Sequence, residues 1–157
     1  MLKIVFVCTG NTCRSCMAEA LARNWLRTKA FQNADTQVTS AGLAAFPDSP
    51  ASHQAVEVMT EKGLDLSCHR AKQFSGDLLD QSDIILTMTE NHRRALVNMF
   101  PQSAVKIRTL AEFADCAGSD IADPFGQSVE VYRRSAAQIE ELIDRAFNKL
   151  FYPGQKS

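Results

Sequence analysis

A cysteine and an arginine near the N-terminus have the spacing of a phosphoryl-binding loop. Five residues separate Cys8 from Arg14, and Ser15 follows directly. Attack on phosphorus requires a thiolate, whereas a free cysteine thiol has a pKa of about 8.5. Inward-facing backbone N–H groups and a helix N-terminus favour the thiolate and also bind phosphoryl oxygens. The pattern therefore indicates that Cys8 is a nucleophile within an anion-binding loop.

The other residues of this segment suit the same chemistry. Arg14 can make a two-pronged contact with phosphoryl oxygens, and Ser15 can donate to the sulfur or to the leaving group. Gly10 and Asn11 tolerate the positive φ that a loop with inward-facing amides requires. A Walker loop is excluded because its lysine is absent. The alternative, a buried cysteine before an ordinary turn, explains less of the pattern.

The elements around this loop predict an α/β protein. An apolar run at residues 4–7 is typical of a strand buried on both faces, and residues 17–28 have helical spacing. Further strands are predicted at residues 37–40, 84–88 and 105–109. Further helices are predicted after Ser49-Pro50, after Thr89 and over residues 128–150, with a long loop over residues 110–127. This alternation indicates a parallel sheet with helices on both faces, in which ligands bind at the carboxyl ends of strands.

Composition limits the partners and the compartment. The 157 residues suit one domain, 1–157, and include 17 Lys and Arg against 18 Asp and Glu, for a net charge of −1. This balance argues against a general electrostatic binder of nucleic acid or membrane. Neither a signal peptide nor an apolar run of membrane-spanning length is visible, and five cysteines cannot all pair. We expect a cytoplasmic monomer without nucleic-acid or membrane partners.

Motifs along nearly the whole chain resemble the low-molecular-weight protein tyrosine phosphatase family. They are residues 7–15 with Met17-Ala18-Glu19, Ser40-Ala41-Gly42, His69-Arg70 after Gly63-Leu64, and Asp123-Pro124-Phe125-Gly126. The resemblance implies a four-stranded parallel sheet in a flavodoxin-like three-layer α/β/α fold. It also implies a protein phosphatase without metal or cofactor that acts on phosphorylated proteins through a phosphocysteine intermediate.

The resemblance assigns roles to individual residues. Cys8 is the expected nucleophile, Arg14 binds phosphate and stabilises the transition state, and Asp123 is the general acid and then the base. A departing phenolate or guanidine benefits from protonation, although Asp120 is a nearby rival for that role. The expected phosphate-binding loop comprises Thr9, Gly10, Asn11, Thr12, Cys13 and Ser15. The loop-supporting network comprises Asn11, Ser15, Ser40 and His69.

Two residues bear on the substrate. Thr12 stands where the tyrosine-directed pattern usually has Ile, and Phe125 stands in an Asp-Pro loop that is not rich in tyrosine. Both features resemble the bacterial protein-arginine phosphatase branch. Phe125 can stack on a planar cation or on a phenol, so Thr12 carries most of the argument. We expect phosphoarginine substrates, with phosphotyrosine as the alternative.

The remaining candidates concern thiols and charge. The resemblance implies a reversible Cys8–Cys13 disulfide, although Cys13 is equally interpreted as a buried filler. Cys16 replaces the family's usual Pro and is expected to pack under the helix, while Cys68 and Cys116 are expected to be inert. A thioredoxin-coupled arsenate reductase would need a further pair of relay cysteines, and a simple phosphate-binding module would need neither nucleophile nor acid. The cluster at residues 92–94 is a solvated basic face or a docking patch for acidic proteins.

Overall fold

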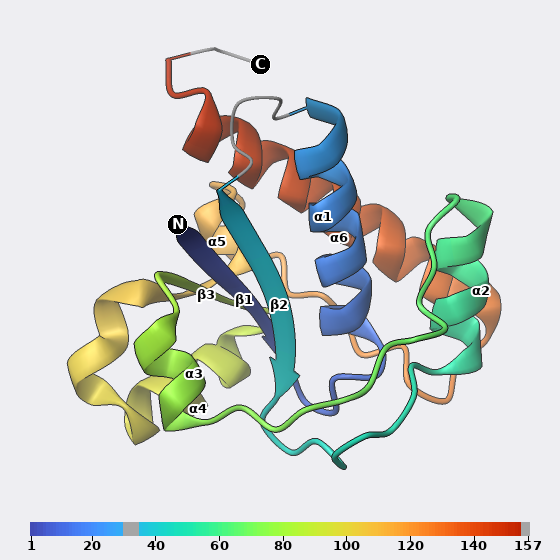
Figure 1. Cartoon of the computed structure of the whole chain (residues 1–157), viewed down its shortest axis with the longest axis horizontal. Helices are drawn as coiled ribbons and strands as arrows, with labels where there is room; N and C mark the ends of the chain where they lie inside the picture. The colour runs from blue at the N-terminus through green and yellow to red at the C-terminus, as the bar shows by residue number, and fades with distance from the viewer. Residues whose placement is uncertain (30–34, 155–157) are drawn as a thin grey trace.

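A four-stranded parallel sheet forms the centre of the protein, as predicted. The computed structural model describes residues 1–29 and 35–154. The strands lie in the order β2-β1-β3-β4, and every neighbouring pair is parallel. They are β1 (Leu2–Cys8), β2 (Thr36–Gly42), β3 (Ile84–Thr87) and β4 (Ile107–Thr109). Figure 1 shows β2 at the edge of the sheet with β1 and β3 behind it.

Helices cover both faces of the sheet and complete the three-layer α/β/α fold (Figure 1). One face packs against α1 (Arg14–Lys29), α2 (His53–Glu61), α5 (Leu110–Phe113) and α6 (Val129–Phe151). The other packs against α3 (Gly76–Gln81) and α4 (Glu90–Met99). A 3-10 helix, η1 (Pro101–Lys106), connects α4 to β4. The predicted fold class is confirmed.

The pleat of β1 decides on which side of the sheet the candidate nucleophile lies. Successive side chains of a strand point to opposite faces. Ile4, Phe6 and Cys8 therefore pack on the side of α1 and α6, whereas Val5 and Val7 pack against α3 and α4. Because β1 is an inner strand, its apolar residues are buried on both faces. The chain leaves β1 at Cys8, directly beneath the start of α1.

The start of α2 differs from the sequence-based expectation. Ser49-Pro50 was expected to cap this helix, but the cap is Ser52, whose Oγ accepts from the Ala55 amide. Ser49 lies before the helix and is paired with a distant segment, since its carbonyl accepts a hydrogen bond from the Ala71 amide. Asp48 donates to the Ala71 carbonyl on the same pair of segments. This contact with residues distant in the sequence outweighs the local capping signal.

Other boundaries shift for local reasons. The first long helix begins at Arg14, and the last strand begins only at Ile107 because η1 occupies the preceding residues. The expected loop over residues 110–127 begins with α5, whose first turn is capped by the Thr109 side chain. The six-residue helix α3 was not predicted. The Thr89 cap is present as expected, and the last helix begins next to its predicted start, with Ser128 as its cap.

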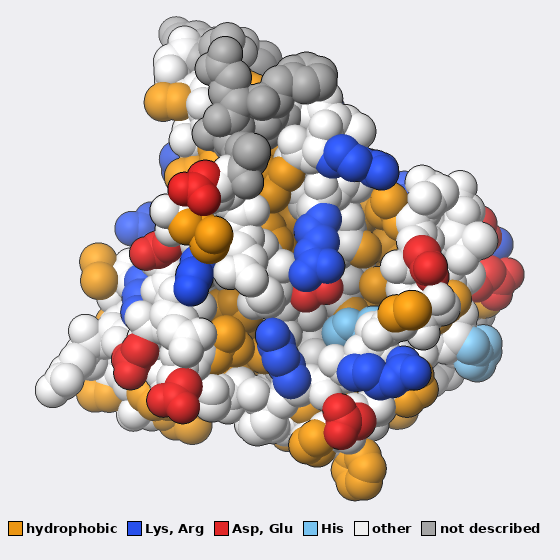
Figure 2. Space-filling model, viewed as in Figure 1, with side chains coloured by type: hydrophobic (Ala, Val, Ile, Leu, Met, Phe, Trp, Pro, Cys, Tyr) orange, Lys and Arg blue, Asp and Glu red, His pale blue; other side chains and the backbone are white. Residues whose placement is uncertain are grey.

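Charged side chains of both signs share the surface. On the face shown in Figure 2, basic and acidic groups lie near one another, in keeping with the net charge of −1. Within residues 1–29 and 35–154, no helix has the length and apolar character needed to cross a bilayer.

Gly42 is the point where β2 meets the turn after β1, and a side chain there has no room. A Cβ on Gly42 would lie 2.5 Å from the Thr9 carbonyl oxygen and 3.0 Å from the Asn11 amide nitrogen. We expect Gly42→Ala to displace this turn, to lower kcat/KM for an aryl phosphate at least tenfold and to destabilise the fold by about 1–3 kcal/mol. Gly76→Ala is the matched control, because its Cβ meets only the Phe100 ring at 3.7 Å. Equal activity of the two variants would contradict the steric argument.

Candidate active site

The phosphate loop (residues 8–15) connects the carboxyl end of β1 to the N-terminus of α1. The Cys13 carbonyl accepts the first helical hydrogen bond, from the Met17 amide at 3.2 Å. The Cys8 side chain is 2% exposed, and its Sγ lies 2.9 Å from Ser15 Oγ. The sulfur is thus placed at the positive end of a helix dipole, next to a hydroxyl that can donate to a thiolate.

Asn11 holds the loop in a left-handed backbone conformation with φ of 58°. Its buried Nδ2 donates to Ser15 Oγ and Ser40 Oγ, both at 2.9 Å. Because Ser15 Oγ accepts from Asn11, the Ser15 hydroxyl proton is free to point at the Cys8 sulfur. His69 Nε2 donates to the Asn11 carbonyl oxygen at 2.6 Å.

The Asn11 side-chain oxygen is also satisfied. It accepts a hydrogen bond from the Lys72 backbone amide at 3.0 Å. The structure therefore brings together the four residues predicted to support the loop, and it adds a backbone amide that the sequence did not indicate. The supporting groups come from three separate parts of the chain: the loop itself, the end of β2 and residues 69–72.

Arg14 is buried at the start of α1, and its side chain crosses to the opposite wall of the site. It is 4% exposed. Nη1 donates to the Ile121 carbonyl oxygen at 2.9 Å, and Nη2 lies 3.6 Å from Asp123 Oδ2. Nε is buried and makes no hydrogen bond to any residue described by the structure. A buried donor without an acceptor is costly, so an anion that accepts from Nε would stabilise this arrangement.

Asp123 and Phe125 form the outer wall of a pocket of about 220 Å³. The Asp123 carboxylate also accepts a hydrogen bond from the Phe125 amide, at 3.1 Å. Phe125 is 70% exposed, with its ring available to a bound group. Asp120, the rival acid, does not line this pocket, and its carboxylate accepts from the Glu90 amide at the start of α4. The pocket lining comprises Cys8, Thr9, Gly10, Thr12, Cys13, Arg14, Asp123 and Phe125.

Cys13 lies on the inner side of the loop. Its Sγ is 3.1 Å from Tyr132 Oη and 3.7 Å from Ser52 Oγ. Tyr132 is buried; its burial, together with the hydrogen bond to Cys13, raises the pKa of the phenol. Cys16 is on the first turn of α1, where its Sγ contacts the Cys13 carbonyl at 3.2 Å. Burial, with a smaller contribution from Cys8 and Cys13, raises the pKa of the Cys16 thiol well above its ordinary value.

The basic cluster at residues 92–94 is not one continuous face. Arg93 and Arg94 pair with Glu90 on the exposed side of α4. His92 instead points inward, is 9% exposed, and has its Nε2 3.0 Å from Thr9 Oγ1. Burial, and secondarily the charge of Arg14, lowers the pKa of His92 to about 4. His92 is therefore neutral at physiological pH, and the expectation of a solvated basic face is wrong for this residue.

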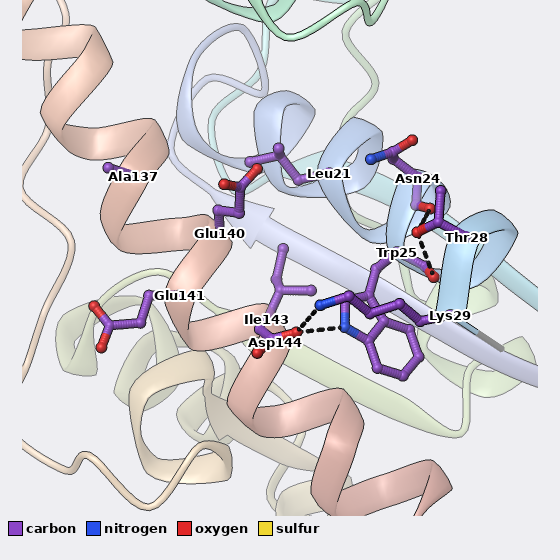
Figure 3. A pocket seen from close by; sticks show the side chains of 10 residues that line it. All are labelled: Leu21, Asn24, Trp25, Thr28, Lys29, Ala137, Glu140, Glu141, Ile143 and Asp144. Carbon is purple, nitrogen blue, oxygen red and sulfur yellow. Dashed lines mark hydrogen bonds and ion pairs between the residues drawn. The ribbon is translucent and has the colours of Figure 1, made fainter. Parts of the chain in front are cut away.

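A second hollow lies between α1 and α6 (Figure 3). It has a volume of about 400 Å³ and is lined by the second half of α1. One of its acidic groups, Asp144, already accepts hydrogen bonds from Trp25 Nε1 at 2.9 Å and Lys29 Nζ at 2.6 Å. The hollow contains no cysteine and no loop amides, so it offers none of the chemistry of the phosphate loop.

Neither Cys68 nor Cys116 lines the pocket formed by the phosphate loop, Asp123 and Phe125. Cys68 is exposed beside His69, and Cys116 contacts Arg145 on α6. Within the described residues, no group of three His, Cys, Asp or Glu side chains is placed to hold a metal ion.

A thiol beside a helix N-terminus, a buried arginine and a carboxylate across the pocket define a cysteine-dependent phosphoryl-transfer site. The family model described as low molecular weight phosphotyrosine protein phosphatase matches residues 3–153. The chain belongs to this family, and it is a protein phosphatase.

Relatives come from both branches of the family. A protein-arginine-phosphatase of Geobacillus stearothermophilus is 43% identical over 148 residues, which cover 94% of this chain and 95% of the relative. The low molecular weight protein-tyrosine-phosphatase PtpB of Staphylococcus haemolyticus is 40% identical over 144 residues, covering 92% and 96%. Among solved structures, a YwlE arginine phosphatase variant with a phosphorylated active-site serine superposes with a TM-score of 0.91. Its sequence identity is 33%, and 98% of each chain is covered.

Several groups that shape the site had little or no signal in the sequence. The Ile121 carbonyl and the Lys72 amide are backbone atoms, which no motif of side chains reveals. The partner of the Tyr132 hydroxyl, Cys13, lies 119 residues away in the sequence. His92 is followed directly by two arginines, so its inward orientation could be found only from the packing of α4.

The lowered pKa of His92 makes stability depend on pH. The unfolded ring binds a proton at a pKa of about 6.5, whereas the folded ring does so only near 4. Between these values the unfolded chain holds more protons, so stability falls as the pH falls. We expect the wild type to lose about 2 kcal/mol more than His92→Gln between pH 7 and pH 4.5. Urea unfolding at both pH values measures this difference.

His53→Gln is the control for this pH experiment, because His53 is exposed at the start of α2. It should retain the wild-type pH dependence. A pH dependence of His92→Gln identical to that of the wild type would show that the folded ring titrates normally.

Proposed function

We propose that this protein removes phosphoryl groups from arginine side chains of proteins. The observation that carries the proposal is the composition of the pocket mouth, where Thr12, Asp123 and Phe125 face the nucleophile. A small hydroxyl side chain, a carboxylate and an exposed aromatic ring suit a planar cation. The similarity to relatives named protein-arginine-phosphatase supports the same substrate class.

In the first step, the Cys8 thiolate attacks phosphorus and the bond from phosphorus to the guanidine nitrogen breaks. Asp123 gives its proton to the departing nitrogen, and a phosphocysteine remains. Arg14 and the loop amides hold the three equatorial oxygens, because phosphoryl transfer requires mainly positioning and charge neutralisation. The named relative with a phosphorylated active-site serine supports an intermediate of this kind.

In the second step, water attacks the phosphocysteine. The Asp123 carboxylate takes a proton from the water, the sulfur–phosphorus bond breaks, and inorganic phosphate leaves. The Cys8 thiolate is regenerated beside the Ser15 hydroxyl, 2.9 Å from Ser15 Oγ.

The proposed acid role of Asp123 predicts a dependence on the leaving group. Asp123→Asn should lower kcat for a phosphoarginine peptide by about 10²–10⁴, the usual contribution of general acid catalysis. The loss should be much smaller for an aryl phosphate whose phenol is acidic enough to leave without a proton. Steady-state kinetics on both substrates measure it. Asp120→Asn is the control and should change kcat for neither substrate. If Asp120→Asn shows the leaving-group dependence instead, the roles of the two carboxylates are reversed.

Thr12 is the residue best placed to determine the substrate class. Its backbone carbonyl accepts the Ser52 amide at 2.9 Å, which fixes its position. Its Oγ1 lies 3.6 Å from the position of a Cβ on Gly10, so the side chain leans across the loop rather than away from it. A hydroxyl there can contact a guanidinium or orient the attacking water, whereas a larger apolar residue would narrow the pocket and favour a phenol.

A comparison of phosphoarginine and phosphotyrosine peptides of the same sequence tests the substrate. The wild type should prefer phosphoarginine, and Thr12→Ile should shift the ratio of kcat/KM at least tenfold toward phosphotyrosine. Thr12→Ser keeps the hydroxyl and should retain the preference, while Thr12→Val keeps the volume and should lose it. A wild type that prefers phosphotyrosine, with no change in Thr12→Ile, would contradict the proposal.

Protein-tyrosine phosphatase activity is the second candidate, favoured by the 40% identity to a protein-tyrosine-phosphatase and by the exposed Phe125 ring. An arsenate reductase is less well supported, because Cys116 contacts Arg145 on α6 instead of lying near the pocket. The reversible Cys8–Cys13 disulfide stays a prediction. The pocket lining that these two cysteines share supports it.

A further inference from the structure

Thr9 and His92 form a contact at the rim of the pocket that none of the proposed catalytic roles uses. Thr9 follows the nucleophile and lines the pocket with its exposed side chain. Its Oγ1 lies 3.0 Å from His92 Nε2, on the first turn of α4. The His92 backbone amide donates to the Thr89 cap, Oγ1, at 3.2 Å, which fixes the backbone from which the ring extends.

The partners of the His92 ring decide which nitrogen carries the proton. His92 Nδ1 is buried and has no hydrogen-bond partner among the described residues. If Nδ1 carried the proton, a buried N–H would have no acceptor, which is rare in native proteins. If Nε2 carries it, that N–H donates to Thr9 Oγ1 and only a lone pair is left unpaired. The second arrangement has the lower cost.

The electrostatic surroundings are consistent with a neutral ring. The charged groups that act on it are Arg14, Asp123 and Asp120. Burial and the Arg14 charge disfavour a second proton on the ring and outweigh the two carboxylates, which lowers the pKa of His92. The His92 ring therefore carries a proton on one nitrogen only. Among the described residues, the ring makes a hydrogen bond only to Thr9.

We propose that His92 is a positioning residue that makes the Thr9 hydroxyl a hydrogen-bond donor to a phosphoryl oxygen. Because Thr9 Oγ1 accepts from His92 Nε2, its own proton is free to point into the pocket. A hydroxyl that already accepts a hydrogen bond is polarised into a stronger donor. Thr9 thus adds a donor to the loop amides and Arg14. The proposal rests on phosphoryl binding in this pocket, as in the proposed function.

The opposite end of the same loop has a matching arrangement. Asn11 Nδ2 donates to Ser15 Oγ, which leaves the Ser15 proton for the Cys8 sulfur. At the other end, His92 is the donor, the Thr9 hydroxyl accepts from it, and the phosphoryl group is the target of the hydroxyl proton. The two hydroxyls would then act on the two reacting partners: Ser15 on the nucleophile and Thr9 on the electrophile.

A double-mutant cycle tests the coupling. Thr9→Val removes the hydroxyl and keeps the shape of the side chain, and His92→Phe removes the ring donor. Each should lower kcat/KM for an aryl phosphate about tenfold and weaken competitive inhibition by inorganic phosphate to a similar degree. The double variant should be no worse than Thr9→Val alone, since the two changes remove one interaction. His92→Gln keeps an N–H donor and should recover most of the loss.

Arg94→Gln is the control on the exposed side of α4 and should match the wild type. The proposal would be overturned if the fold losses of kcat/KM multiplied in the double variant, or if His92→Gln gave no rescue. In either case His92 would act through folding or another contact. If His92→Phe does not fold, nitrogen-15 NMR of the wild-type ring decides: protonation at Nε2 is expected, and protonation at Nδ1 would refute the mechanism. Phosphate inhibition does not depend on the preferred substrate. A failure of the phosphoarginine proposal would therefore leave this cycle interpretable.

Discussion

The left-handed backbone of Asn11 is the constraint on which the rest of the site depends. A residue with φ of 58° turns the chain sharply enough for Cys8 and Arg14 to face one pocket from the two ends of a short loop. Such a conformation is costly for most residues and is tolerated by asparagine. Four hydrogen bonds fix it: two from the side-chain nitrogen, one to the side-chain oxygen and one to the carbonyl.

The same loop explains how a chain of net charge −1 can bind a phosphoryl dianion. The positive potential is local. It comes from the start of α1 and from the buried Arg14, whose guanidinium is held between the Ile121 carbonyl and Asp123. Asp123 thus has two relations to Arg14: it partly neutralises a buried charge, and it is placed across the pocket from the nucleophile. The contact between Arg14 and Asp123 thus contributes both to the burial of the arginine and to the placement of the proposed acid.

Local patterns in the sequence predicted much of the architecture. The strand–loop–helix order around Cys8, the cap at Thr89 and the helical stripe over residues 128–150 are encoded by neighbouring residues, and the structure has them. The errors arise where distant segments decide. The cap moves from Ser49 to Ser52 because residues 48–49 pair with Ala71. His92 turns inward because its ring contacts Thr9, on the loop after β1.

The site itself was predictable only in part. Spacing and family resemblance predicted which side chains line the pocket, and the structure brings these side chains together. The spacing of residues does not show the direction of a hydrogen bond. Whether a hydroxyl donates to its target depends on a further group that donates to the hydroxyl oxygen. Ser15 and Thr9 are both ordinary hydroxyl residues in the sequence, and their roles follow from Asn11 and His92.

The dispersal of these supports along the chain has a consequence for synthesis. Cys8, Cys13 and Cys16 leave the ribosome first, whereas Ser40, His69, His92 and Ile121 follow later. Until the last of these segments is in place, the loop has no fixed amides, and its cysteines have the reactivity of thiols in an unfolded peptide. The activated nucleophile is therefore a property of the finished molecule, and a nascent or truncated chain does not expose it.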